Sequence, residues 1–166
     1  MPWSEPRVQR CRTACRVRAA GLKADVRNLG FAGSACLEPE MADFIAGEPF
    51  DHATLEMGIN ILGMDPDEYA RRVRYFVKRV AEAHPQAKIL AIDVYGNRLS
   101  EGGRACAARF REIVKRTVKE LALPNVTYVN GLEIIPDDVE ICTGGAHPTP
   151  KGHEIIAKGL LERFLR

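Results

Sequence analysis

Short apolar runs alternate with amphipathic helical patterns along most of this 166-residue chain. The runs predict buried strands at residues 25–29, 52–57, 88–95 and 125–130. Apolar residues spaced three and four positions apart predict helices at residues 39–46, 66–83, 104–121 and from 150 onward. This alternation is typical of an α/β fold with a parallel sheet covered by helices on both faces.

The second helix carries the strongest local signals in the chain. Asp65 suits its N-cap, Pro66 suits its first position, and Glu68 completes a pattern close to a capping box. One apolar stripe follows at helical spacing, formed by Tyr69, Val73, Phe76, Val77 and Val80. The last helix has a similar start, because Thr149 precedes Pro150 as a predicted cap.

Composition predicts one domain with a sizeable core, since 46% of the residues are hydrophobic. The net charge of +2 argues against a nucleic-acid partner for the chain as a whole. No apolar run approaches the ~20 residues of a membrane span, so no membrane association is expected. We also find no apolar segment typical of a signal peptide at the start.

Charge is unevenly distributed, because residues 1–24 hold six Arg and Lys side chains and only one acid, Glu5. Residues 1–24 therefore form an atypical basic N-terminal segment, and residues 25–166 are the predicted domain. The five cysteines are odd in number and lack paired spacing, which indicates reduced thiols and a cytoplasmic protein. No metal site and no cofactor are expected, because neither metal-ligand spacing nor a phosphate-binding glycine loop occurs.

Three polar or glycine positions follow predicted strands or precede a helix, where an α/β sheet binds its ligands. His147 stands in a loop between glycines and prolines just before the last helix, as suits a general base. Asn60, in Gly58-Ile59-Asn60, follows a buried strand and could donate its amide to an oxyanion. Gly30 follows the first strand, where a backbone N–H can approach a ligand closely. Each position alone is also explained by an ordinary turn or surface residue.

The order and spacing of these positions resemble the SGNH (GDSL-type) hydrolase family. The resemblance implies a three-layer, flavodoxin-like α/β/α fold and hydrolysis of small acyl or acetyl esters by serine–histidine chemistry. It implies that His147 is the base, and that Gly30 and Asn60 are oxyanion donors. The partner would be a small-molecule ester substrate, with no cofactor.

Two features of the family pattern are missing from the sequence. The Gly-Asp-Ser or Gly-Ser-Ser block, which supplies the nucleophile after a first strand, has no counterpart here, so we expect that strand to be missing too. The aspartate three positions before the histidine is replaced by Gly144. Ser34 is the nearest substitute nucleophile, ahead of Ser100. The acids near His147 are Asp137, Asp138 and Glu140.

Two functional hypotheses therefore stay open at this point. The chain is either an ester hydrolase, or a catalytically inactive relative that serves as a binding or scaffold domain. A flavodoxin-like nucleotide binder is disfavoured, because no phosphate-cradling glycine loop follows a strand. A sheet that lacks its first strand would expose an edge beside residues 25–29, which favours aggregation or a homo-oligomer.

Overall fold

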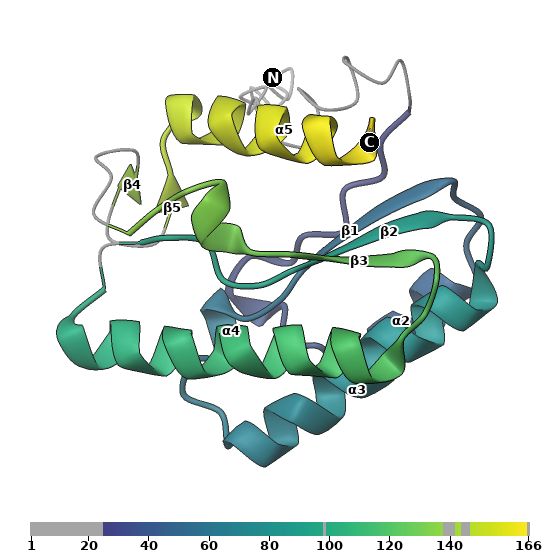
Figure 1. Cartoon of the computed structure of the whole chain (residues 1–166), viewed down its shortest axis with the longest axis horizontal. Helices are drawn as coiled ribbons and strands as arrows, with labels where there is room; N and C mark the ends of the chain where they lie inside the picture. Colours follow the sequence, from purple (N-terminus) through teal and green to yellow (C-terminus); the bar gives the residue numbers. More distant parts are fainter. Residues whose placement is uncertain (1–24, 98, 138–141, 144–146, 166) are drawn as a thin grey trace, which may run out of the picture.

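The computed structural model describes residues 25–97, 99–137, 142–143 and 147–165. The basic segment 1–24 lies outside the described residues, as do Asp138, Glu140 and Gly144. Figure 1 shows a central sheet between two helical layers.

The central sheet has three parallel strands in the order β1-β2-β3. These are β1 (His52–Glu56), β2 (Lys88–Ile92) and β3 (Val126–Val129). Strand β2 is buried between its neighbours, and four of its five residues are buried. This matches the near-continuous apolar run that a central parallel strand requires.

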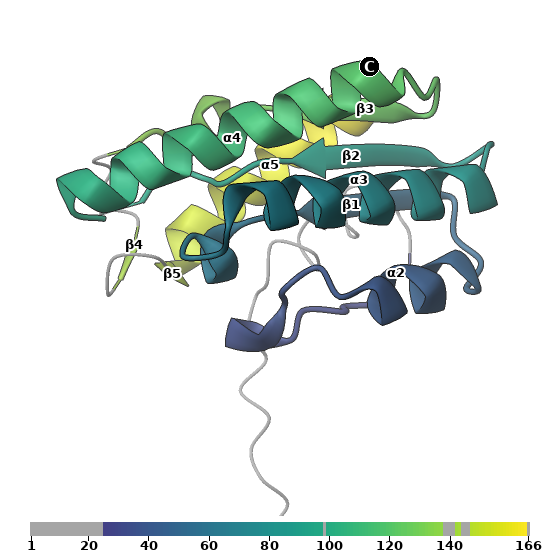
Figure 2. The same ribbon diagram turned by 90° about the horizontal axis from the view of Figure 1, so that it is seen from below.

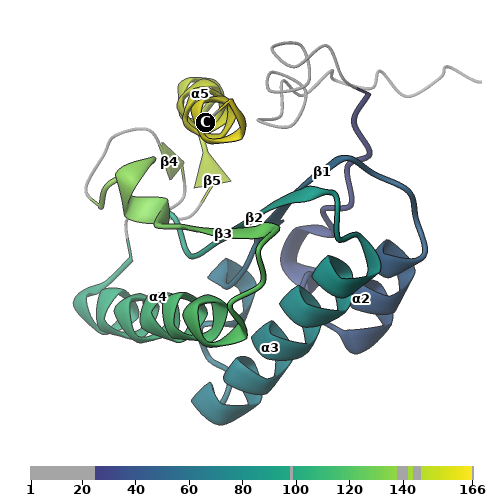
Figure 3. The same cartoon turned by 45° about the vertical axis from the view of Figure 1, so that its right-hand side comes forward.

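Three helices cover one face of the sheet and a fourth covers the other (Figures 1 and 3). The first layer holds α2 (Pro39–Ala46), α3 (Pro66–Ala83) and α4 (Glu101–Leu121). The opposite layer is α5 (Pro150–Phe164). Short 3₁₀ turns are η1 (Ala32–Ser34), η2 (Ile59–Ile61) and η3 (Gly131–Glu133). Strands β4 (Cys142–Thr143) and β5 (His147–Pro148) form a separate antiparallel pair, named here the His147 ribbon.

The core has one part on each side of the sheet. On the side of α3 and α4, the rings of Tyr69 and Phe110 lie 4.2 Å apart, and both residues are buried. On the side of α5, Leu160 and Phe164 pack with Leu90 of β2. Burial of such apolar surface supplies most of the free energy that favours the folded state.

Helix boundaries follow the capping residues. Asp65 accepts hydrogen bonds from the backbone N–H groups of Asp67 and Glu68, both at 3.0 Å, so the predicted cap of α3 is confirmed. Thr149 accepts the Gly152 N–H at 3.2 Å, which confirms the predicted start of α5. Helix α4 begins three residues earlier than predicted, because Ser100 serves as its cap.

The predicted strand at residues 25–29 is wrong, since the chain is irregular there. A strand is stable only when its backbone groups pair with a neighbour, and residues 25–29 pair with none of the described strands. In the described sheet β1 is an edge strand, since β2 is its paired neighbour. None of the described helices has the length and apolar character needed to cross a bilayer.

Candidate active site

The carboxyl ends of β1, β2 and β3 meet at one edge of the sheet because the strands are parallel. In Figure 2 the arrow of β2 points toward the end of the molecule where β4 and β5 lie. The turn η2 follows β1 and the turn η3 follows β3, so both begin at this edge as well. Ligands of parallel α/β sheets bind at such an edge.

Gly58 is required where β1 turns into η2. Its φ of 136° belongs to a region that residues with a side chain rarely adopt. A Cβ atom there would lie 2.6 Å from Val94 Cγ2 and 3.2 Å from the Tyr69 hydroxyl oxygen. That hydroxyl donates to the Met57 carbonyl at 3.2 Å, which fixes the ring beside the turn. The backbone conformation and the close packing thus explain why glycine occupies position 58 of the Gly58-Ile59-Asn60 motif.

Asn60 lies on η2 with its side chain exposed at this edge. Its Nδ2 atom donates to the Ala35 carbonyl at 3.4 Å. This contact brings Ala35, the residue after η1, beside the asparagine. Gly30 lies five positions before Ala35 in the sequence, and no described hydrogen bond joins it to Asn60.

The Gly30 backbone N–H donates to the Asn28 side-chain oxygen at 3.0 Å. This is a local turn of the kind that asparagine commonly makes with the residue two positions ahead. For the Gly30 N–H to reach an oxyanion, it must exchange this internal partner for the ligand.

Ser34 ends η1 and is exposed to solvent. Its backbone N–H donates to the Phe31 carbonyl at 3.0 Å. The hydroxyl of Ser100 has a structural partner, because it accepts the Gly103 N–H at 3.3 Å as the N-cap of α4. Of the two described serines, Ser34 lies nearer in sequence to the Asn60 contact at Ala35.

His147 stands on β5, exposed to solvent and opposite Thr143 in the ribbon register. The sequence predicted only a loop here, and the structure shows a two-stranded antiparallel pair. Pro148 and the Thr149 cap connect the histidine directly to α5. The backbone that carries the imidazole is thus paired with β4 and is followed within three residues by α5.

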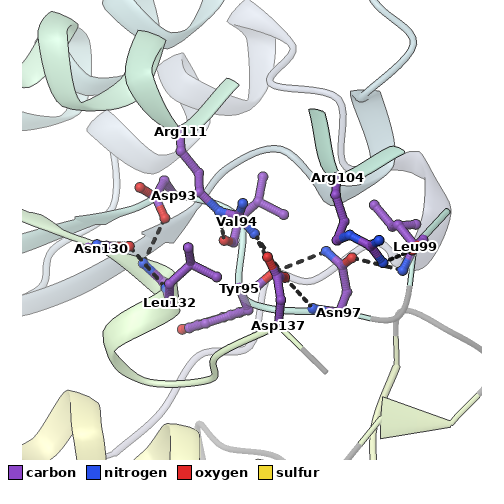
Figure 4. A network of polar contacts seen from close by, with 11 residues as sticks. Asp93, Val94, Tyr95, Asn97, Leu99, Arg104, Arg111, Asn130, Leu132 and Asp137 are labelled. Atoms are coloured by element: carbon purple, nitrogen blue, oxygen red, sulfur yellow. Dashed lines mark hydrogen bonds and ion pairs between the residues drawn. The ribbon is translucent and has the colours of Figure 1, made fainter. Parts of the chain in front are cut away.

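Among the candidate acids, only Asp137 lies within the described residues. Its Oδ1 atom accepts the Asn97 backbone N–H at 3.2 Å and lies 3.6 Å from an Arg111 guanidinium nitrogen (Figure 4). This carboxylate is therefore engaged with Asn97 and Arg111.

Sequence reasoning missed a buried carboxylate at the end of β2. Asp93 is fully buried and accepts the Tyr128 hydroxyl at 2.5 Å and the Gly131 N–H at 2.7 Å. Burial raises the pKa of Asp93, and these two hydrogen bonds oppose that rise. The sequence held one signal that could have indicated this residue, namely a single acid within the apolar run at residues 89–95.

Glu56, the last residue of β1, was also missed. Glu56 is exposed at the carboxyl end of β1, next along the sheet to the end of β2 that carries Asp93. Desolvation, followed by the charge of Asp93, raises the pKa of Glu56 to about 7. Burial of the Tyr69 ring is the main cause of a raised pKa at Tyr69, and the charges of Glu56 and Asp93 add to it. An acid that titrates near neutrality thus lies four residues before Asn60.

Within the described residues, no group of three or more His, Cys, Asp or Glu side chains could hold a metal ion. The elements at this end of the sheet carry an imidazole on β5, a side-chain amide on η2, and carboxylates at the ends of β1 and β2. Such groups are suited to proton transfer and to stabilising a developing oxyanion.

A family model described as the GDSL-like lipase/acylhydrolase family matches residues 6–155. The chain belongs to this family. The match includes Gly30, Asn60 and His147, which supports the predicted membership. No curated protein sequence matches this GDSL-like chain.

Solved structures share the fold of this GDSL-like chain at low sequence identity. A salicylyl-acyltransferase from a tetracycline biosynthetic pathway has a TM-score of 0.80 and 23% identity, over 93% of this chain and 48% of its own. A family two carbohydrate esterase from Cellvibrio japonicus has a TM-score of 0.69 and 19% identity, over 92% and 50%. An acetyl-xylooligosaccharide esterase from Geobacillus has a TM-score of 0.70 and 19% identity, over 90% and 80%.

These similarities confirm the predicted α/β fold, with a parallel sheet flanked by helices. The chain spans about half the length of the first of these structures.

Proposed function

We propose that this GDSL-like chain is an ester hydrolase in which His147 is the general base. The Asn60 amide and the Gly30 N–H are the proposed oxyanion donors. The observation that supports the proposal is the hydrogen bond from Asn60 to the Ala35 carbonyl, next to Ser34, at the end of the sheet where the His147 ribbon also lies.

In the proposed reaction, His147 takes the proton of a serine hydroxyl as its oxygen attacks the ester carbonyl carbon. The negative charge that develops on the carbonyl oxygen accepts hydrogen bonds from Asn60 and Gly30. Collapse of this intermediate breaks the bond to the alcohol, which leaves with the proton from His147. Water then releases the acid from the acyl-serine by the same two steps.

Ser34 is the proposed nucleophile among the described serines, because the hydroxyl of Ser100 serves as a helix cap. The expected substrates are small acyl or acetyl esters. Acetylated xylooligosaccharides are a sensible first substrate to test, since a protein of the same fold is an acetyl-xylooligosaccharide esterase. Cys36 and Cys106 are free thiols, which supports the proposed cytoplasmic location.

A binding or scaffold role is the second candidate. Two observations favour it: the Gly30 N–H is bonded to Asn28, and Asp137 is bonded to Asn97. In this alternative, the protein keeps the fold and the loops at this edge of the sheet but does not hydrolyse esters.

Hydrolysis of p-nitrophenyl acetate and of acetylated xylooligosaccharide, followed with purified protein, distinguishes these candidates. His147→Ala is compared with His52→Ala, a matched histidine at the amino end of β1 whose ring contacts Phe164. We expect turnover in the wild type and in His52→Ala, and its loss in His147→Ala. Equal background rates in all three proteins would reject hydrolysis and leave the binding role.

A further inference from the structure

Arg72 of α3 contacts both an acid of its own helix and the segment that follows η1. Its Nε donates to Glu68 Oε1 at 2.6 Å, and its Nη1 donates to the Cys36 carbonyl at 2.9 Å. The side chains of Arg72 and Glu68 are only 28% and 27% exposed. Glu68 lies in the first turn of α3, four positions before Arg72, so the two side chains meet on one face of the helix. The carboxylate therefore orients the guanidinium that reaches Cys36.

The segment that Arg72 contacts is the connection 35–38, which joins η1 to α2. Two side chains bind its first two carbonyl groups. Asn60 Nδ2 donates to the Ala35 carbonyl at 3.4 Å, and Arg72 donates to the next carbonyl, that of Cys36. Each peptide unit is planar, so only the two backbone torsions of Cys36 separate these carbonyls. The position of the Ala35 carbonyl therefore depends on how firmly Cys36 is held.

The connection 35–38 also contains an unfavourable backbone conformation. Leu37 has a φ of 56°, in the left-handed region that residues with a side chain rarely adopt. The Leu37 side chain is buried in the core beside α3, and the Cys36 N–H donates to the Glu38 carboxylate at 3.1 Å. Such a conformation persists only where surrounding contacts hold it. The hydrogen bond from Arg72 to Cys36, directly before Leu37, is one of these contacts.

We propose that Arg72 is a positioning residue for Asn60, acting through the Cys36 carbonyl of the connection 35–38. By holding Cys36 it fixes the Ala35 carbonyl, and with it the direction of the Asn60 amide. This role rests on the proposed function only in giving Asn60 a catalytic task as an oxyanion donor. The effect on the Asn60 side chain rests on the contacts of Arg72 and is measurable without turnover.

The neighbouring arginine provides a matched control. Arg71 also pairs with Glu68, and its side chain is 75% exposed. Arg71→Met and Arg72→Met each remove one arginine from Glu68, but among the described contacts only Arg72→Met removes the hydrogen bond to Cys36. Arg72→Lys keeps the charge and loses the planar geometry that binds both partners. Glu68→Gln keeps the arginine and weakens its orientation, so it tests the same connection if Arg72→Met fails to fold.

The readouts are the side-chain amide resonances of Asn60 in NMR spectra of asparagine-labelled protein, amide exchange in residues 34–38, and kcat and KM for p-nitrophenyl acetate. The signals that disappear in Asn60→Ala assign the Asn60 resonances. The internal reference is Asn125, whose Nδ2 donates to the Ala81 and His84 carbonyls.

We expect Arg72→Met to shift or broaden the Asn60 resonances and to speed exchange in residues 34–38, while the Asn125 resonances stay unchanged. Arg72→Lys should restore the Asn60 spectrum only in part, and Glu68→Gln should cause a smaller change of the same kind. If the wild type turns over ester, kcat should fall roughly ten- to a hundredfold in Arg72→Met with little change in KM.

Folded Arg72→Met protein with the Asn60 spectrum and the exchange rates of Arg71→Met would overturn the proposal. The same result in both Arg72→Lys and Glu68→Gln would overturn it if Arg72→Met does not fold. Absence of turnover in the wild type would refute the proposed function alone, and the spectra and exchange rates would then decide the role of Arg72.

Discussion

The carboxylate of Asp93 accepts the backbone N–H of Gly131 at 2.7 Å, which joins the end of β2 to the turn that follows β3. Asp93 is fully buried, and a Cβ atom on Gly131 would lie 2.8 Å from the Asp93 carbonyl oxygen. The hydrogen bond and the close approach together position the start of the loop 131–137, which leads to the His147 ribbon.

Removing this carboxylate should destabilise the protein, because the Gly131 N–H and the Tyr128 hydroxyl both lose their acceptor. We expect Asp93→Ala to lower the free energy of unfolding by about 2–4 kcal/mol. Tyr128→Phe, which removes one of the two hydrogen bonds and adds no buried unpaired donor, should cost about 1 kcal/mol. Denaturant unfolding followed by circular dichroism measures both. Equal stability of Asp93→Ala and wild type would contradict this role.

Gly58→Ala should be destabilising by at least about 2 kcal/mol, since a side chain combines strain at positive φ with overlap at Val94. Gly63→Ala is the matched control, because nothing lies within 4 Å of a Cβ atom there. Thermal or denaturant unfolding of the two variants gives the comparison. If both substitutions lower the free energy of unfolding by the same amount, the close packing around Gly58 does not explain why glycine occupies that position.

Glu56 should make stability depend on pH near neutrality. Its pKa is about 7 in the folded protein and near 4.5 when unfolded, so the folded state binds more protons between these values. The free energy of unfolding should therefore fall as pH rises from about 4.5 to about 7. The full shift corresponds to roughly 3 kcal/mol, and solvent exposure of the side chain reduces our expectation to about 1 kcal/mol.

Glu56→Gln, which cannot ionise, should flatten this part of the stability profile and be more stable than wild type at pH 8. Denaturant midpoints at pH 5, 6, 7 and 8 test both expectations. The same slope in variant and wild type would assign the pH dependence to another group.

Asn60→Ala should lower kcat roughly a hundred- to a thousandfold on an ester substrate, as expected when an oxyanion donor is removed. KM should change little, because the interaction forms in the transition state rather than in the bound substrate. The stability of Asn60→Ala is measured in parallel, since Asn60 also donates to Ala35. An unchanged kcat in a stable variant would remove Asn60 from the proposed mechanism.

The sequence predicted the helices well because their signals are local. Helix α2 spans the predicted residues 39–46, and α3 starts at its capped Pro66. The strand predicted at 25–29 was wrong because a strand needs a partner, and pairing cannot be read from an isolated apolar run. The His147 ribbon was missed because its strands are two residues long, too short to show any alternation.

The polar groups of the site were predicted unevenly for a similar reason. His147, Asn60 and Gly30 stood out by their place relative to strands and by the family resemblance. Arg111 was not singled out from the sequence, and the structure shows it buried against Val94 and Tyr95. These contacts join residues distant in sequence, which no local pattern reports.

Covalent labelling with a fluorophosphonate tests the central claim most directly, because this reagent reacts with a serine only when a base activates the hydroxyl. The chain contains three serines, Ser4, Ser34 and Ser100, so peptide mapping by mass spectrometry can assign the adduct. We predict one adduct per chain, on Ser34, that is lost in His147→Ala and retained in His52→Ala. Absence of any serine adduct, or labelling that persists without His147, would contradict the account.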